Sequence, residues 1–138
     1  MVLLASIILL ASLSQSHGRS TNPQQLVHDF YTWYFKIYNE LGIYARSGEI
    51  YNYVDRKLVD YVDMHDDKID YFTQMGYRHA PWTNVKTIVG NPIALKNKTF
   101  ALPVTFKFNW GKWHVVVFVE EENNALYIVR VMDIFPYS

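Results

Sequence analysis

The spacing of the apolar residues changes once along this chain, near Met75, and that change limits the folds open to it. Before Met75, two segments repeat apolar residues every three or four positions, which is the period of an amphipathic helix. Beyond it the chain is rich in Val, Ile, Phe and Thr, with the alternation of a strand. Helices followed by strands predict an α+β domain, with N-terminal helices packed on one face of a curved antiparallel sheet.

The two predicted helices have recognisable ends. Thr21 or Asn22 can cap the first helix, and Gly42 is a suitable stop for it. Ser47 is the expected cap of a second, continuous helix that runs to Val62.

The strand region divides at clear turn signals. Strands are expected at 85–89, 93–95, 99–108, 113–120 and 125–134, paired as an antiparallel meander. In the third of these, large apolar residues from Phe100 to Phe108 alternate with small or polar ones, which predicts one buried face. Pro103 cannot donate a ladder hydrogen bond, so this strand is expected at an edge of the sheet or with a bulge.

The N-terminal residues have a different character. Val2 to Leu13 is a run of twelve apolar or small residues, shorter than the roughly 20 that span a bilayer but typical of a secretory signal peptide. We therefore expect a signal peptide at 1–18 and a single α+β domain at 19–138, exported to the periplasm and without a membrane span after cleavage. No Lys or Arg precedes the run, so the alternatives are a truncated start, an uncleaved anchor or a buried apolar N-terminus. The chain has no cysteine, which excludes disulfides, thiol chemistry and a lipid carried on cysteine.

Short aromatic motifs resemble a known family. The segments "LVHDFYTWYFKIY" and "DKIDYFTQMGY", with Trp113 in the last hairpin, resemble the exported bacterial family called domain of unknown function 3828. The resemblance covers nearly the whole chain after the apolar start. It implies a nuclear transport factor 2-like, or cystatin-like, fold. Members of that family include periplasmic and lipid-anchored envelope proteins, some of them candidate immunity proteins encoded beside secreted toxins, and no catalytic residue is established for it.

The most acidic segment is "DYVDMHDDKIDYF", Asp60 to Phe72, with five aspartates and one histidine. It lacks the spacing of a calcium-binding loop, and one histidine among carboxylates is weak support for zinc or manganese. A solvated helix end is the preferred interpretation, with Ile69 and Phe72 packed inward and the carboxylates exposed. A protein-binding acidic surface and a metal site are the alternatives, and no cofactor is predicted.

Catalytic motifs are missing from the sequence. It contains no Gly-rich phosphate loop, no G-x-S-x-G and no H-E-x-x-H. By analogy with related folds, Asp29, Tyr31 or Asp133 could transfer protons, but nothing in their spacing selects them. We therefore predict that the protein is not an enzyme.

Charge is divided along the chain although the formal net charge is zero. Nine of the thirteen acids lie between Asp29 and Asp70, whereas Tyr71 to Val119 holds six Lys or Arg and no acid. Because helices and sheet form different layers, this predicts one negative and one positive face, which favours docking to a complementary protein. Nucleic acid is not an expected partner of a neutral chain. Salt-sensitive self-association, such as a homodimer, is an alternative use of the two faces.

Together these patterns predict a non-enzymatic periplasmic protein-binding domain, most concretely an immunity-type inhibitor that neutralises a secreted antibacterial toxin. The alternatives are an envelope carrier of small ligands or lipids, which needs a hydrophobic pocket, and an enzyme. The residues predicted to be exposed and to bind the partner are Asp63, His65, Asp66 and Asp67 on one side and Trp82, Trp110 and Lys112 on the other. For Trp110 the alternative is that it covers the end of the sheet's core together with Trp113.

Overall fold

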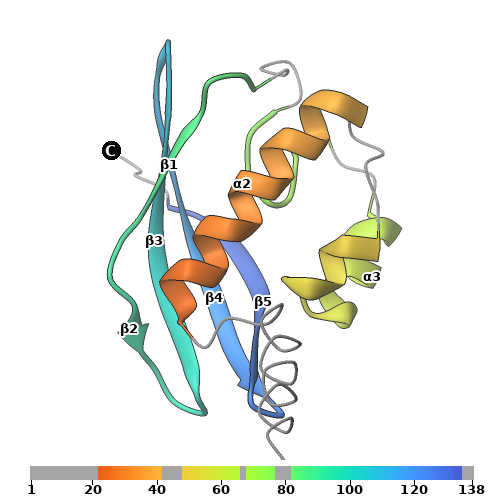
Figure 1. Ribbon diagram of the computed structural model, residues 1–138, viewed down its shortest axis with the longest axis vertical. Helices are drawn as coiled ribbons and strands as arrows, with labels where there is room; N and C mark the ends of the chain where they lie inside the picture. The colour runs from red at the N-terminus through yellow and green to blue at the C-terminus, as the bar shows by residue number, and fades with distance from the viewer. Residues whose placement is uncertain (1–21, 42–47, 66–67, 77–81, 135–138) are drawn as a thin grey trace, which may run out of the picture.

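A helical layer covers one face of a five-stranded antiparallel sheet (Figure 1). The computed structural model describes residues 22–41, 48–65, 68–76 and 82–134. The α+β fold class, with helices packed on one face of a curved antiparallel sheet, is confirmed.

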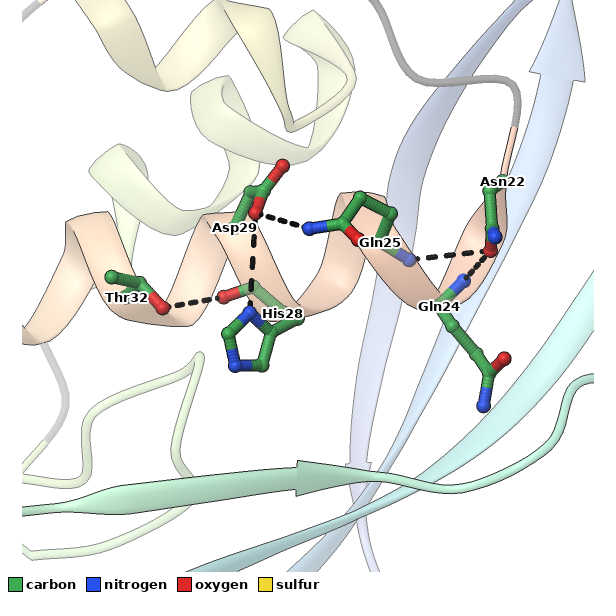
Figure 2. Close-up of polar contacts among 6 residues, drawn as sticks. All are labelled: Asn22, Gln24, Gln25, His28, Asp29 and Thr32. Atoms are coloured by element: carbon green, nitrogen blue, oxygen red, sulfur yellow. Dashed lines mark hydrogen bonds and ion pairs between the residues drawn. The ribbon is translucent and has the colours of Figure 1, made fainter.

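Helix α2, Pro23–Leu41, crosses the sheet diagonally (Figure 1). Asn22 caps it as predicted, because its Oδ1 accepts hydrogen bonds from the backbone N–H groups of Gln24 (2.9 Å) and Gln25 (3.3 Å) (Figure 2). The predicted stop, Gly42, and the predicted second cap, Ser47, lie outside the described residues.

The second helical segment is broken, so the prediction of one continuous helix is wrong. It consists of a 3-10 helix, η3 (Gly48–Asn52), and helix α3 (Arg56–Met64), whose N-cap is Asp55. Between them the backbone pairs with strand β5: Asp55 N–H donates to the Ile128 carbonyl (2.9 Å), and Ile128 N–H donates to the Tyr53 carbonyl (2.8 Å). Pairing with the edge of the sheet replaces the helical hydrogen bonds at this point.

The strands lie close to their predicted positions. Their order is β1-β3-β4-β5, with β2 paired to β3 on the same side as β1. The bounds are β1 Lys86–Val89, β2 Ile93–Ala94, β3 Thr99–Phe108, β4 Gly111–Glu122 and β5 Ala125–Asp133. All pairs are antiparallel, as predicted, but the predicted meander holds only from β2 to β5, because β1 pairs with β3 and not with β2.

Strand β3 lies inside the sheet, so the edge position or bulge predicted from Pro103 is wrong. Pro103 is paired with Val116 of β4, and on its other side the ladder is interrupted between β1 and β2. At this interruption Gly90 N–H donates to the Pro103 carbonyl (2.8 Å). Pro103 has no N–H to donate to the ladder, and on that side the neighbouring strand β1 has already ended. A side chain at position 90 would bring its Cβ within 2.7 Å of Pro103 Cγ, so the close approach requires glycine.

The core fills the space between α2 and the sheet, and most of it is aromatic. Leu102, Val104 and Phe106 are buried on the face of β3 toward the helices, which confirms the predicted alternation. Phe35 of α2 meets two other rings edge to face, Phe106 at 5.3 Å and Trp82 at 5.8 Å between ring centroids. The largest fully buried aromatic side chains are those of Phe30, Tyr31, Phe72, Trp82 and Phe106.

The segment after α3 is fixed to α2 through a buried carboxylate. Asp70 is 3% exposed and accepts hydrogen bonds from the Tyr34 hydroxyl (2.5 Å) and from the Thr73 N–H and hydroxyl (2.9 and 2.8 Å). Phe72 packs inward as predicted, but Ile69 is exposed. The prediction is therefore wrong for Ile69 and for Asp70, because hydrogen bonds to the carboxylate of Asp70 draw it inside.

Replacing Asp70 by alanine is expected to lower the free energy of unfolding by about 2–3 kcal/mol, since the buried Thr73 donors and the partly buried Tyr34 hydroxyl would lose their carboxylate acceptor. Asp60→Ala is the matched control: Asp60 is exposed on α3, and its loss is expected to change stability by less than about 0.5 kcal/mol. Urea denaturation monitored by circular dichroism measures both values. Equal effects of the two substitutions would contradict the structural role of Asp70.

Candidate partner-binding surfaces

The C-terminal end of α3 exposes apolar side chains next to charged ones. We call this surface the α3 tip and define it by Tyr61, Asp63, Met64, His65 and Ile69. Met64 is 81% exposed, and Tyr61 and Ile69 are each 51% exposed. Large apolar side chains exposed together in this way are typical of protein–protein contact surfaces.

The charged residues of the α3 tip agree in part with the sequence prediction. Asp63 and His65 are exposed, whereas Asp66 and Asp67 lie outside the described residues. The His65 ring stacks on Tyr61 with 4.1 Å between centroids, and its Nδ1 lies 2.7 Å from the Tyr61 carbonyl oxygen. Within the described ranges, no three His, Asp or Glu side chains are grouped to hold a metal ion.

The α3 tip rests on a segment that is tied to both layers of the fold. Tyr31 donates a hydrogen bond from its hydroxyl to the Phe72 carbonyl (2.6 Å), and the Tyr71 hydroxyl accepts one from Val131 N–H of β5 (3.2 Å). The Tyr71 ring also lies edge-on to Tyr61, 6.2 Å away. These contacts hold the base of the tip in place, so little order needs to be gained when a partner binds.

A second surface lies on the sheet face turned away from α2. Lys86 of β1 is paired with Lys107 of β3, which is paired in turn with Lys112 of β4; we call these three residues the lysine row. Lys107 follows the buried Phe106, so its side chain points away from the helices. In the part of the chain that the structure describes, no carboxylate forms an ion pair with these lysines. Like charges directly opposite each other on neighbouring strands are destabilising.

The residues next to the lysine row are polar or apolar but not acidic. Ile88, Thr105 and His114 form the adjacent row, and the Thr105 hydroxyl lies 2.9 Å from His114 Nδ1. Ile88 and, farther across the face, Met132 are exposed. This sheet face therefore combines positive charge with accessible apolar surface.

Trp110 and Lys112 are exposed as predicted, at and just after the hairpin between β3 and β4. Trp110 is 54% exposed and stacks on Phe108 with 4.7 Å between ring centroids. Phe108 packs against the core, as does the partly buried Trp113. Trp110 therefore extends the end of the core, as the alternative interpretation proposed, while keeping an accessible face.

Trp82 is the one described residue of the predicted set that is not exposed. It is 1% exposed, and its ring stacks on Tyr38 at 4.5 Å. Asn39 holds its backbone from both sides: its Oδ1 accepts from Trp82 N–H (3.0 Å) and its Nδ2 donates to the Trp82 carbonyl (2.8 Å). The prediction of an exposed Trp82 is wrong because this residue fills the end of the core under α2.

The residues considered for proton transfer lie in three different environments. Asp29 is exposed on the outer face of α2, where it accepts from Gln25 Nε2 (2.7 Å) and lies 3.9 Å from His28 Nδ1 (Figure 2). Tyr31 is in the filled core, where burial, followed by the nearby Asp70, raises its pKa well above the usual value. Desolvation raises the pKa of Asp133, which is exposed at the end of β5. The three groups share no described pocket.

A hollow between η3 and the β4–β5 hairpin is polar rather than apolar. Charged residues line it from both sides, with Asp55 and Arg56 facing Glu122, and Arg56 lies 4.3 Å from the centre of the Tyr51 ring. A lipid carrier needs a deep apolar pocket, and this hollow is not one. Bulky side chains fill the space between α2 and the sheet. None of the described helices is long and apolar enough to cross a membrane.

Sequence reasoning missed several residues of these surfaces. Tyr61 lies in the predicted second helix and Met64 lies just beyond its predicted end at Val62, and only tertiary structure shows that both side chains are left uncovered. The pairing of Lys107 with Lys112 could have been found, since a two-residue turn at Asn109 and Trp110 places them opposite each other. The pairing with Lys86 depends on the register of β1.

Replacing Lys107 by glutamate is expected to raise the free energy of unfolding by about 0.5–1 kcal/mol at low salt, because two like-charge pairs become opposite-charge pairs. Lys107→Gln should give a smaller gain, and Lys96→Glu, in the β2–β3 turn, serves as the control. Urea titrations in about 0.05 M and about 0.5 M salt, between which the electrostatic screening length falls roughly threefold, measure the difference. A loss of stability in Lys107→Glu with no salt dependence would contradict the repulsion.

Comparisons with known proteins identify a fold relative but no family. No family model matches the chain, and no curated protein matches it. The structure is similar to the immunity protein Tai3 in the crystal structure of the type VI native effector–immunity complex Tae3–Tai3 from Ralstonia pickettii. The TM-score is 0.69 at 20% sequence identity, and the match covers 86% of this chain and 100% of that chain. At this identity the similarity shows that the two proteins share a fold.

Proposed function

We propose that the protein is an immunity-type inhibitor, which binds a secreted protein effector in the periplasm and blocks it. The observation that carries this proposal is the similarity to a chain from an effector–immunity complex, extending over the full length of that chain. Membership in the domain of unknown function 3828 family and an export signal at 1–18 belong to the same proposal. The aromatic motifs and the N-terminal apolar run support them.

The α3 tip is the part of the surface best suited to block an effector. Met64 and Tyr61 offer apolar anchors of the kind that dominate binding energy when they are buried in a partner's pocket. Asp63 adds negative charge, and Asp66 and Asp67 follow in the sequence. A negatively charged tip is suited to a positively charged cleft, where electrostatic attraction speeds association.

Inhibition of this kind needs no catalytic group. The tip only has to occupy the cleft, and the contacts of Tyr31, Tyr71 and Asp70 hold its base while it does so. Binding then excludes substrate for as long as the complex lasts, so inhibition is governed by the dissociation rate.

The decisive experiment tests the product of the gene adjacent to this protein's gene as the candidate effector. Export of that effector to the periplasm of a test bacterium is expected to stop growth, and co-expression of the full chain should restore it. Deletion of residues 1–18 should abolish protection while leaving binding in vitro intact. Failure of the purified proteins to form a complex would contradict the proposal.

Loss of the apolar anchors is expected to weaken this complex strongly. The double substitution Tyr61→Ala and Met64→Ala should raise the Kd at least about thirtyfold, as truncation of interface anchors commonly does. Isothermal titration calorimetry measures the change. Thr32→Ala and Lys36→Ala, both on the exposed face of α2, form the control and should leave the Kd within about twofold. If both double variants bind equally well, the α3 tip is not the inhibitory surface.

A further inference from the structure

We propose that the lysine row is a second docking site, which binds an acidic helix of a partner protein lying across strands β1, β3 and β4. Because Lys107 alternates with the buried Phe106, the row points to the face of the sheet opposite the helical layer; Figure 1 shows this layer on one face of the sheet. A partner bound at the α3 tip would therefore leave it uncovered. This inference goes beyond the inhibitory role and does not depend on it.

Charge is the first argument for an acidic occupant. Lys86, Lys107 and Lys112 stand opposite one another on neighbouring strands without an ion pair to any described carboxylate. From Tyr71 to Val119 the chain contains no acid that could neutralise them. Such an arrangement costs stability in the isolated protein, and an array of carboxylates supplied from outside would offset that cost.

Spacing favours a helix over other acidic structures. Neighbouring strands lie about 4.7–4.9 Å apart, so the three lysines are spaced at about that interval along a line across the sheet. Side chains three or four positions apart on a helix have Cβ atoms about 5–6 Å apart. A helix with Glu or Asp at i, i+4 and i+7 or i+8 can therefore place one carboxylate at each lysine.

The surroundings of the row favour protein over an anionic membrane. Ile88 is exposed in the adjacent row and can meet the apolar side of an amphipathic helix. Glu120 lies on the same face of β4 as Lys112, about 27 Å away at about 3.4 Å per residue. A flat anionic surface covering the whole face would meet this carboxylate, whereas a single helix, about 10–12 Å wide, would not reach it.

The test uses a stapled helical peptide with glutamate at i, i+4 and i+8 and leucine on its flank, and a control peptide with glutamine in place of glutamate. The acidic peptide should bind the purified protein at low salt and shift the amide resonances of Lys86, Lys107 and Lys112 in NMR spectra. The variant Lys86→Gln, Lys107→Gln, Lys112→Gln should bind it at least about tenfold more weakly. The variant Lys57→Gln, Lys96→Gln, Lys98→Gln removes the same charge elsewhere and should retain binding within about twofold.

Four results would overturn the proposal. They are the absence of peptide binding, equal weakening in the two variants, row-dependent binding to vesicles containing anionic phosphatidylglycerol, and row-dependent self-association in analytical ultracentrifugation. The last two would assign the row to a membrane or to a second copy of the chain. Because the peptide is unrelated to the effector, these results are independent of whether the protein neutralises one.

Discussion

The side chain of Tyr31 connects helix α2, the sheet and the segment after α3, and the rest of the structure depends on this connection. Its ring packs edge to face against Phe106 of β3, 4.8 Å away, and against Phe30 of the same helix at 4.9 Å. Its hydroxyl donates to the Phe72 carbonyl in the segment after α3. One buried residue thus joins α2, the sheet and the base of the α3 tip, and its hydrogen bond satisfies a polar group that burial would otherwise make unfavourable.

This arrangement separates a rigid interior from two accessible surfaces of different chemistry. Aromatic packing occupies the space in which related α+β architectures could hold a ligand, so the interior contributes stability and the surfaces remain for recognition. The α3 tip combines Met64 and Tyr61 with carboxylates, and the lysine row combines positive charge with Ile88. The neutral net charge of the chain conceals this division, which favours oriented association with charged partners.

The sequence was most informative where structure is determined locally. Asn22 caps α2, and the alternation along β3 gives the buried face, because each depends only on neighbouring residues. It was least informative where contacts with an element distant in the sequence determine the local structure. Val54 pairs with the edge of β5 and breaks a helix, and Asn39 draws Trp82 into the core.

The same limit applies to the candidate surfaces. Asp63, His65, Trp110 and Lys112 are exposed as their polar or turn positions indicated. Asp70 differs from its acidic neighbours only because Tyr34 and Thr73 donate hydrogen bonds to it, which spacing alone does not reveal. The lysine row depends at Lys86 on the register of β1, which is fixed by pairing with β3 and not by neighbouring residues.

The inhibitory role that we propose depends on the α3 tip as the surface that contacts the effector. Hydrogen–deuterium exchange of the protein alone and in complex with its candidate effector, the product of the adjacent gene, tests this dependence. We expect slower exchange on binding in residues 56–65 and 68–76, with little change in the β2–β3 turn. Protection confined to the sheet, with the α3 tip exchanging at the same rate in the free protein and in the complex, would contradict it.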